Sequence, residues 1–179
     1  MRTAYIGMGG NLASWAGTPE ATLAAAALGL AALGRVTHRS SLYSTEPVGF
    51  AEQPRFINAI VALETELEPQ KLLKGLLAIE QEFGRDRSAG FKNGPRTLDL
   101  DILLLGDLKI AEAGLEIPHP RMAEREFVLV PLNEIAPLLV DPGSGRTVSQ
   151  LLESLQQKPG SAGNAVVPIQ SDIWRAGAC

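Results

Sequence analysis

The segment that most constrains this chain is an apolar run with two aspartates inside it. Residues 98–105 read Leu-Asp-Leu-Asp-Ile-Leu-Leu-Leu and end at Gly106, a pattern that predicts a buried β-strand. Side chains alternate between the two faces of a strand, so we expect Asp99 and Asp101 on the same side, roughly 6.5–7 Å apart. Two carboxylates on one buried face repel each other and lose hydration, and a bound cation offsets that cost.

The residues leave two kinds of cation open. One interpretation is structural, with the aspartates paired to Arg85, Arg87 and Arg96, which stand just upstream. The other is a magnesium site, because Mg²⁺ takes one or two carboxylates together with phosphate oxygens and water. We favour magnesium, because structural acid pairs usually lie at strand ends and not inside a leucine-rich run. Arginine side chains bind phosphate in bidentate fashion, so the whole cluster predicts phosphoryl-transfer chemistry.

Composition limits the class of ligand. The net charge is −4, whereas a protein that binds nucleic acid usually carries a basic excess, so we expect neither DNA nor RNA as a partner. Four of the 16 Lys and Arg residues fall between Arg85 and Arg96, which suits a small anionic ligand. Cys179 is the single cysteine, and no signal peptide or apolar run of 18 residues is present. We therefore expect a cytoplasmic protein that does not bind membranes.

The pattern of apolar and helix-breaking residues predicts an α+β fold. Thr18 and Pro19 predict the start of a first helix and Gly34 its end, and Pro69 and Gly84 bracket a second helix. Strands are expected at 2–6, 36–44, 56–63 and 98–105. The resulting β-α-β-β-α-β order is that of the ferredoxin-like fold, an antiparallel sheet with both helices on one face. The other face is then covered by something or used as a site.

The remaining segments are expected to add to this core. A hairpin turn is expected at 106–108, an extended and then turn-like segment at 118–137, and a helix at 147–157. At 179 residues the chain fits one domain, which we place at 1–157, followed by a tail of uncertain order at 158–179.

Several polar residues lie where a structural role does not fully account for them. Asn58 shares a strand face with Phe56, and a flat heterocycle could stack on the ring and hydrogen-bond the amide. His119, between two prolines, is either a structural hydrogen-bonding residue or a ligand contact. The glycine-rich residues 7–11 match neither common phosphate-binding glycine motif, and we interpret them as a tight turn from strand to helix.

The run Lys92-Asn93-Gly94-Pro95-Arg96-Thr97-Leu98-Asp99-Leu100-Asp101-Ile102-Leu103, with Arg87 before it, resembles the signature of the 6-hydroxymethyl-7,8-dihydropterin pyrophosphokinases of folate biosynthesis. Weaker similarities follow in the family's order at 5–12, 43–49, 53–58 and 118–132, so that the resemblance covers roughly residues 3–155.

The resemblance implies a ferredoxin-like fold, ATP as co-substrate, two Mg²⁺ ions and transfer of pyrophosphate to the pterin, with release of AMP; we expect a monomer. By position it implies catalytic roles for Arg85, Arg96, Asp99 and Asp101, with both aspartates as metal ligands. It implies pterin contacts for Thr45, Val48, Phe56, Asn58 and Phe127. It implies ATP contacts for Glu80, Arg87, Arg96, Ile102, His119 and Arg125.

The sequence also departs from the family pattern. Asn93 stands where many relatives carry Trp, and the sequence does not say what replaces that ring. Two other functions stay open: a nucleotidyltransferase or cyclase, whose similar sheet presents an acid pair to a metal-bound triphosphate, and a regulatory module that binds ATP or pterin without turnover. The products discriminate, because AMP supports a pyrophosphokinase and free pyrophosphate supports a nucleotidyltransferase.

Overall fold

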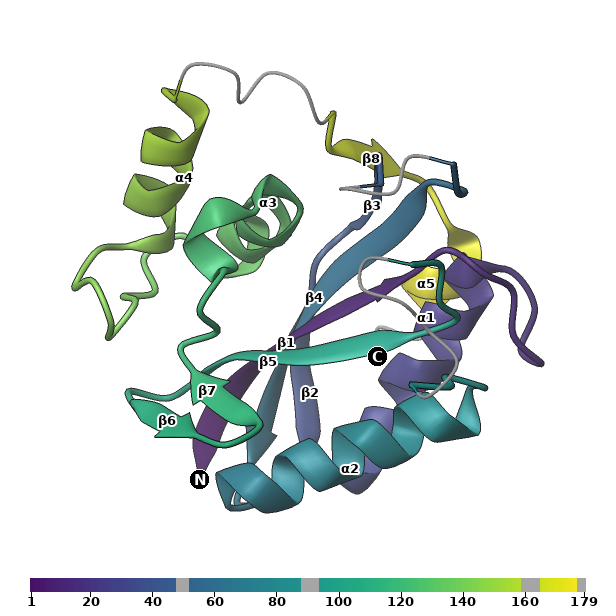
Figure 1. Cartoon of the computed structure of the whole chain (residues 1–179), viewed down its shortest axis with the longest axis horizontal. Coiled ribbons are helices and arrows are strands. Elements are labelled where there is room, and N and C mark those ends of the chain that lie inside the picture. The colour runs from purple at the N-terminus through teal and green to yellow at the C-terminus, as the bar shows by residue number, and fades with distance from the viewer. Residues whose placement is uncertain (48–51, 88–93, 159–164, 177–179) are drawn as a thin grey trace.

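The computed structural model describes residues 1–47, 52–87, 94–158 and 165–176. Its centre is a twisted antiparallel sheet with helices on both faces (Figure 1). The strands are β1 (Arg2–Gly10), β2 (Arg35–Arg39), β3 (Leu42–Thr45), β4 (Phe56–Thr65), β5 (Asp99–Leu105), β6 (Ile110–Glu112), β7 (Leu115–Ile117) and β8 (Val167–Ile169). The helices are α1 (Pro19–Gly29), α2 (Pro69–Glu82), α3 (Glu126–Ile135), α4 (Val148–Gln156) and α5 (Asp172–Ala176), with 3-10 turns η1 (Leu30–Ala32) and η2 (Met122–Glu124).

The strand order is β5-β1-β4-β3-β8, with β2 also paired to β4 and a separate β6-β7 hairpin. The first strand of the chain lies between the third and the last of the β-α-β-β-α-β unit, and all pairs are antiparallel. This arrangement confirms the predicted ferredoxin-like α+β core. None of the described helices is both long enough and apolar enough to span a membrane.

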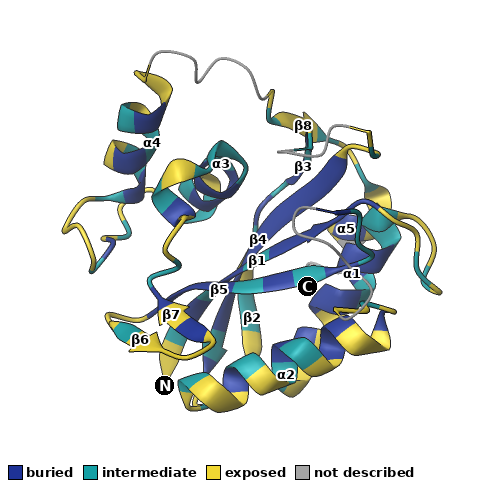
Figure 2. Ribbon diagram, in the orientation of Figure 1, coloured by how far each residue is buried: buried dark blue, intermediate teal, exposed yellow. Residues whose placement is uncertain are grey.

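The sheet separates two apolar cores. On one face α1 and α2 pack against β1, β4 and β5 through residues such as Leu23, Leu72 and Leu63. On the other face α3 and α4 pack through residues such as Leu129 and Leu151. Burial on both sides explains why nearly every residue of β4 is buried, whereas α2 alternates between buried and exposed positions (Figure 2).

Helix capping follows the sequence closely. The Thr18 side chain caps α1 by accepting a hydrogen bond from the Ala21 amide, and Pro69 occupies the first turn of α2. Gly84 follows α2 with a φ of +82°, as its predicted role at the helix end requires. The first helix, however, ends at Gly29 and passes into η1, so the predicted end at Gly34 is wrong. A Cβ on Gly34 would lie 2.2 Å from the Glu64 carbonyl oxygen, so this glycine permits close packing against β4.

Two other predicted elements differ from the structure. The strand expected at 36–44 is interrupted at Ser40, whose side chain accepts a hydrogen bond from the Ile60 amide and so replaces one rung of the ladder. The segment expected to be extended at 118–137 contains α3, although Pro131 lies inside this helix. Burial of Val128, Leu129 and Leu132 offsets the loss of one backbone hydrogen bond.

The C-terminal part of the chain also carries regular structure. The predicted helix at 147–157 is confirmed as α4, which Thr147 and Gln150 close with a reciprocal capping box. The sequence does not show whether the tail after residue 157 is ordered. The structure places β8 and α5 in this tail. The hairpin is formed by β6 and β7, a few residues beyond the turn expected at 106–108.

Candidate active site

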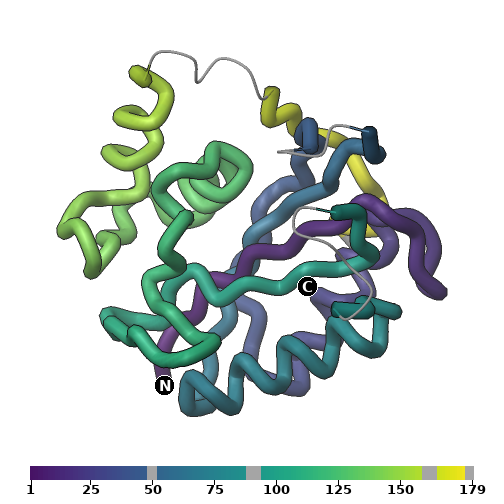
Figure 3. Tube along the Cα trace, viewed as in Figure 1, coloured from purple at the N-terminus to yellow at the C-terminus, as the bar shows by residue number. Residues whose placement is uncertain are grey.

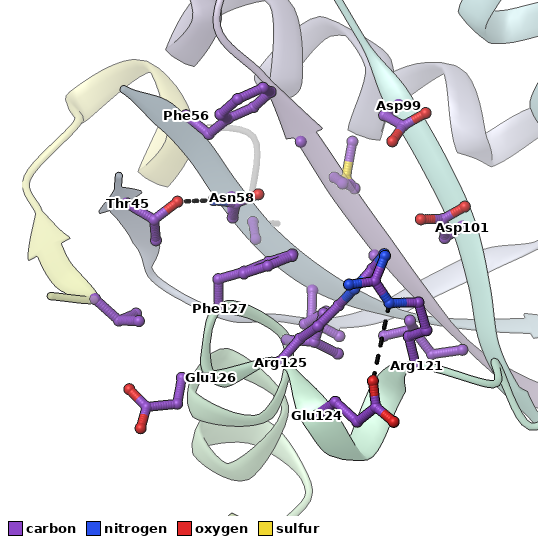
Figure 4. Close-up of a pocket in the computed structure, with 18 of the residues that line it drawn as sticks. Thr45, Phe56, Asn58, Asp99, Asp101, Arg121, Glu124, Arg125, Glu126 and Phe127 are labelled. Carbon is purple, nitrogen blue, oxygen red and sulfur yellow. Dashed lines mark hydrogen bonds and ion pairs between the residues drawn. The ribbon is translucent and has the colours of Figure 1, made fainter. Parts of the chain in front are cut away.

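A cavity of about 300 Å³ opens on the sheet face that carries α3, between the sheet and the segment that leads into α3 (Figure 4). Asp99 and Asp101 of β5 line one side of it, and Thr45, Phe56 and Asn58 line the other. The third wall comes from Arg121, Arg125 and Phe127. The cavity therefore joins an acidic end, on β5, to an end that offers aromatic rings and an amide.

The floor of the cavity is made by glycines of β1. In the register of the sheet, Gly9 lies between Asn58 of β4 and Asp99 of β5, and Gly7 lies between Ile60 and Asp101. A Cβ on Gly9 would lie 2.8 Å from the Asn58 side-chain oxygen. A side chain at this position would therefore displace the Asn58 amide from the place that it holds in the cavity wall.

The glycines correct one prediction. Residues 7–10 form the end of β1 and not a turn from strand to helix. Asn11 comes next, and its side chain accepts a hydrogen bond from the Arg96 amide at 2.9 Å while donating to the Pro54 carbonyl at 2.9 Å. This role depends on contacts with residues far along the chain, so no sequence pattern marks it.

Asp99 and Asp101 lie on the same face of β5, as the strand pattern predicts. Burial raises the pKa of Asp101, and the neighbouring Asp99 raises it further, whereas His119 and Arg125 act in the opposite direction. Burial and mutual repulsion therefore make it unfavourable for both carboxylates to be ionised together. A bound cation would offset this cost.

Three arginines surround Asp99. The Arg96 Nε lies 3.2 Å from one carboxylate oxygen, and Nη2 atoms of Arg85 and Arg87 lie 3.7 and 3.9 Å from the other. The Nε atoms of Arg85 and Arg96 are buried without a hydrogen-bond partner. Arg85 and Arg96 thus keep hydrogen-bonding capacity for another anion, because these buried Nε donors have no hydrogen-bond partner and the 3.7 Å contact of Arg85 with Asp99 is an ion pair and not a full hydrogen bond.

The other end of the cavity suits a flat, polar ring. The Asn58 amide donates to the Thr45 hydroxyl at 2.7 Å, which fixes the orientation of both groups. Phe56 from β4 and Phe127 from α3 each lie beneath a guanidinium, Arg96 at 4.9 Å and Arg125 at 5.5 Å from the ring centroid. These cation–π contacts connect the arginines of the cavity to its aromatic rings.

A comparison with known families identifies the class of protein. Residues 5–137 match the family model described as 7,8-dihydro-6-hydroxymethylpterin-pyrophosphokinase (HPPK). The chain belongs to the HPPK family. The match covers Asp99 and Asp101, the arginines around Asp99, and Phe56, Asn58 and Phe127 at the aromatic end of the cavity.

Individual relatives agree with the family. The chain is 48% identical over 152 residues to a 2-amino-4-hydroxy-6-hydroxymethyldihydropteridine pyrophosphokinase of Synechocystis, covering 85% of this chain and 75% of that protein. It is 48% identical over 147 residues to one of Haemophilus influenzae, covering 80% and 88%. A folate synthesis bifunctional protein of Arabidopsis thaliana matches at 51% identity over 100 residues, 56% of this chain and 20% of that protein.

Solved structures agree on the fold. Wild-type Plasmodium falciparum HPPK-DHPS superposes with a TM-score of 0.68 at 16% sequence identity, over 91% of this chain and 47% of that one. This chain thus spans less than half of that longer chain. At this identity the likeness concerns the fold alone.

Not every residue that the HPPK resemblance assigns to ATP lies in the cavity. Glu80 is 1% exposed, and its carboxylate accepts the Leu100 amide at 2.7 Å and two guanidinium nitrogens of Arg87 at 2.7–2.9 Å. The Ile102 side chain lies in the core between the sheet and helices α1 and α2 and does not line the cavity. Any contact of Ile102 with a ligand would therefore come from its backbone. Val48 lies outside the described residues.

His119 stands beside the acid pair. Its backbone amide donates to the Leu103 carbonyl at 2.9 Å, and its Nδ1 accepts from the Arg121 amide at 3.1 Å, which leaves the proton on Nε2. Burial lowers the pKa of His119, and Asp101 opposes that shift.

Proposed function

We propose that this chain transfers the β,γ-pyrophosphate of ATP to the hydroxymethyl oxygen of 6-hydroxymethyl-7,8-dihydropterin and releases AMP, as a step of folate biosynthesis. The observation that carries the proposal is the glycine-floored cavity that connects an acid pair ringed by arginines to an amide between two aromatic rings. A polyphosphate and a flat heterocycle fit these two ends. We expect a monomeric, cytoplasmic enzyme.

The acidic end fits magnesium. Among residues 1–47, 52–87, 94–158 and 165–176, no group of three His, Cys, Asp or Glu side chains could hold a metal ion by itself. Mg²⁺ usually takes only one or two carboxylates and completes its shell with phosphate oxygens and water. Asp99 and Asp101 would therefore hold two ions together with ATP. Magnesium supplies charge neutralisation and polarises phosphate oxygens when it is bound.

The arginines support the transfer of a charged group. Arg85 and Arg96 are paired with Asp99. When ATP binds, they could exchange that carboxylate for phosphate oxygens on the same side of the cavity. Arg87 is more than half exposed and is held by Glu80, so it can reach a phosphate from outside. Guanidinium groups at these positions orient the polyphosphate and neutralise charge that builds during transfer. We assign His119 and Arg125 to the ATP side of the cavity as well.

The aromatic end supports binding of the acceptor. Phe56 and Phe127 would stack on the two faces of the pterin, and Asn58 and Thr45 would hydrogen-bond its edge. Val48 keeps its expected pterin contact as a proposal. A hydroxymethyl group on the ring edge would then point along the glycine floor toward the phosphates.

The products of the reaction test the proposal. With ATP, Mg²⁺ and the hydroxymethyl dihydropterin supplied together, we expect equal amounts of AMP and diphosphorylated pterin by chromatography. Free pyrophosphate would indicate a nucleotidyltransferase, and binding of both ligands without any product would indicate a regulatory module. Asp101→Asn is expected to lower turnover by about 10²-fold or more while the fold persists, since its role is electrostatic.

A further inference from the structure

Residues 165–176, here called the C-terminal strap, run along the edge of the sheet beside β3 (Figure 3). β8 pairs with β3 so that Val167, Pro168 and Ile169 lie opposite Ser44, Tyr43 and Leu42. α5 packs against α1, and the Trp174 indole, 5% exposed, donates to the Ser40 carbonyl at 2.8 Å. The strap is therefore fixed at both of its ends. It lies outside residues 5–137, which the family model matches.

The strap reaches the cavity itself. Val166, the residue before β8, lines the cavity together with Thr45 and Phe127. These residues mark the end that offers rings and an amide and not the end that holds the acid pair. A ligand in contact with Val166 is thus a heterocycle and not a polyphosphate.

Arg55 connects the strap to the rest of this wall. Its guanidinium donates to the Ser44 hydroxyl at 2.9 Å, to a Glu46 carboxylate oxygen at 3.1 Å and to the Ala165 carbonyl at 3.3 Å. One side chain before β4 therefore ties together the end of β3, the residue after it and the start of the strap. Glu46, which Arg55 binds directly, and Val166, which follows the Ala165 carbonyl that Arg55 binds, both line the cavity.

We propose that the C-terminal strap is a wall of the acceptor subsite, with Val166 in contact with the bound pterin and Arg55 as the positioning residue that sets this wall. The inference rests on the proposed function and deepens it. A strap that only covered the sheet edge would protect β3 from pairing with other chains and would leave affinity for the acceptor unchanged.

Truncation of Val166 tests the contact. Val166→Ala is expected to raise KM for the pterin about three- to tenfold, because it removes two apolar carbons from the subsite, and to leave KM for ATP and kcat unchanged. Val167→Ala is the matched control, because neighbouring strand residues face opposite ways and Val167 is 46% exposed. An unchanged KM in Val166→Ala, or an equal rise in both variants, would overturn the contact.

Removal of the guanidinium tests the positioning role. Arg55→Met keeps the aliphatic stem but no donor, and is expected to raise KM for the pterin more than KM for ATP, with partial recovery in Arg55→Lys. Arg35→Met, which breaks an exposed ion pair with Glu64 at the other end of β4, is the control. A lowered melting temperature with unchanged KM would show that Arg55 is structural only and would overturn its role.

Equilibrium binding separates the two proposals. The probe is 6-hydroxymethylpterin, the oxidised form, titrated into wild type and Val166→Ala. Weaker binding by the variant supports the strap as a wall even if no AMP forms and the proposed function fails. Equal binding by both proteins would overturn the proposed contact between the strap and the pterin. AMP formation by the wild type would still support the proposed function.

Discussion

At the scale of single residues, the buried carboxylate of Glu80 joins three parts of the site. It lies in α2, accepts a hydrogen bond from the Leu100 amide between the two aspartates of β5, and holds Arg87. Burial raises the pKa of Glu80, and the contacts with Leu100 and Arg87 oppose that shift. Glu80 therefore fixes the position of β5, the strand that carries both aspartates, against α2, a role that the family resemblance alone does not show.

Substitution of Glu80 separates its two contacts. Glu80→Ala leaves the Leu100 amide buried without an acceptor and is expected to lower the free energy of unfolding by about 2–4 kcal/mol. Glu80→Gln keeps an oxygen for that amide and is expected to cost less than half as much in urea unfolding. Glu82→Ala, at an exposed position of the same helix, is the control. Equal losses in both Glu80 variants would mean that the ion pair with Arg87, and not the amide contact, stabilises the site.

At the scale of elements, α3 is tied to the edge of the sheet by one carboxylate. Glu134 accepts hydrogen bonds from the Ser41 amide and hydroxyl at 2.9–3.0 Å and from the Tyr43 hydroxyl at 3.0 Å. Burial, and then the hydrogen bond and charge of Glu134, raise the pKa of Tyr43 to about 12. This contact holds the helix that carries Phe127 against the strand that carries Thr45.

The contact predicts a dependence of stability on alkaline pH. The unfolded phenol has a pKa of 10.0 and the folded one of about 12, so the folded state binds the Tyr43 proton more tightly. Its contribution is full below pH 10 and is lost as the pH rises toward about 12. In Tyr43→Phe the free energy of unfolding, measured with urea, should fall less steeply over this range than in wild type. The same slope in both proteins would contradict the assignment.

Local chemistry explains which elements the sequence could predict. Thr18, Pro69 and Gly84 are helix boundaries that depend on their own backbone conformation, and the structure confirms them. The helix around Pro131 could not be predicted, because packing against β4 outweighs a poor local propensity. The end of β1 could not be predicted for a related reason: Gly9 permits a close approach to Asn58 from another strand.

The same division holds for the candidate site. Asp99 and Asp101 could be found because a two-residue spacing on a strand fixes their common face. Asn11, Arg55 and Val166 could not, because their roles depend on residues far along the chain: Asn11 bonds to Pro54, Arg55 bonds to Ala165, and Val166 shares the cavity with Thr45. A sequence pattern reports neighbours along the chain, whereas these contacts exist only after the sheet has formed.

At the scale of the whole molecule, the distribution of charge couples the two ligands of the acidic end. The protein carries a net charge of −4, yet Arg85, Arg87 and Arg96 gather around Asp99. On the proposed function, Mg²⁺ would meet only one unpaired carboxylate of the pair for as long as the arginines neutralise Asp99. A bound polyphosphate would draw the arginines away and would bring its own oxygens, so we expect each ligand to improve the site for the other.

Thermal stability measures this coupling. Mg²⁺ alone is expected to raise the melting temperature by no more than about 1 °C, since Asp99 is already paired. A non-hydrolysable ATP analogue with Mg²⁺, each near 100 times its dissociation constant, should raise it by about 5–10 °C, more than the separate effects combined. Asp101→Asn should lose the magnesium-dependent part and keep the part due to the analogue. Full stabilisation by Mg²⁺ alone would show that the acid pair is a preformed metal site and that the arginines do not compete for it.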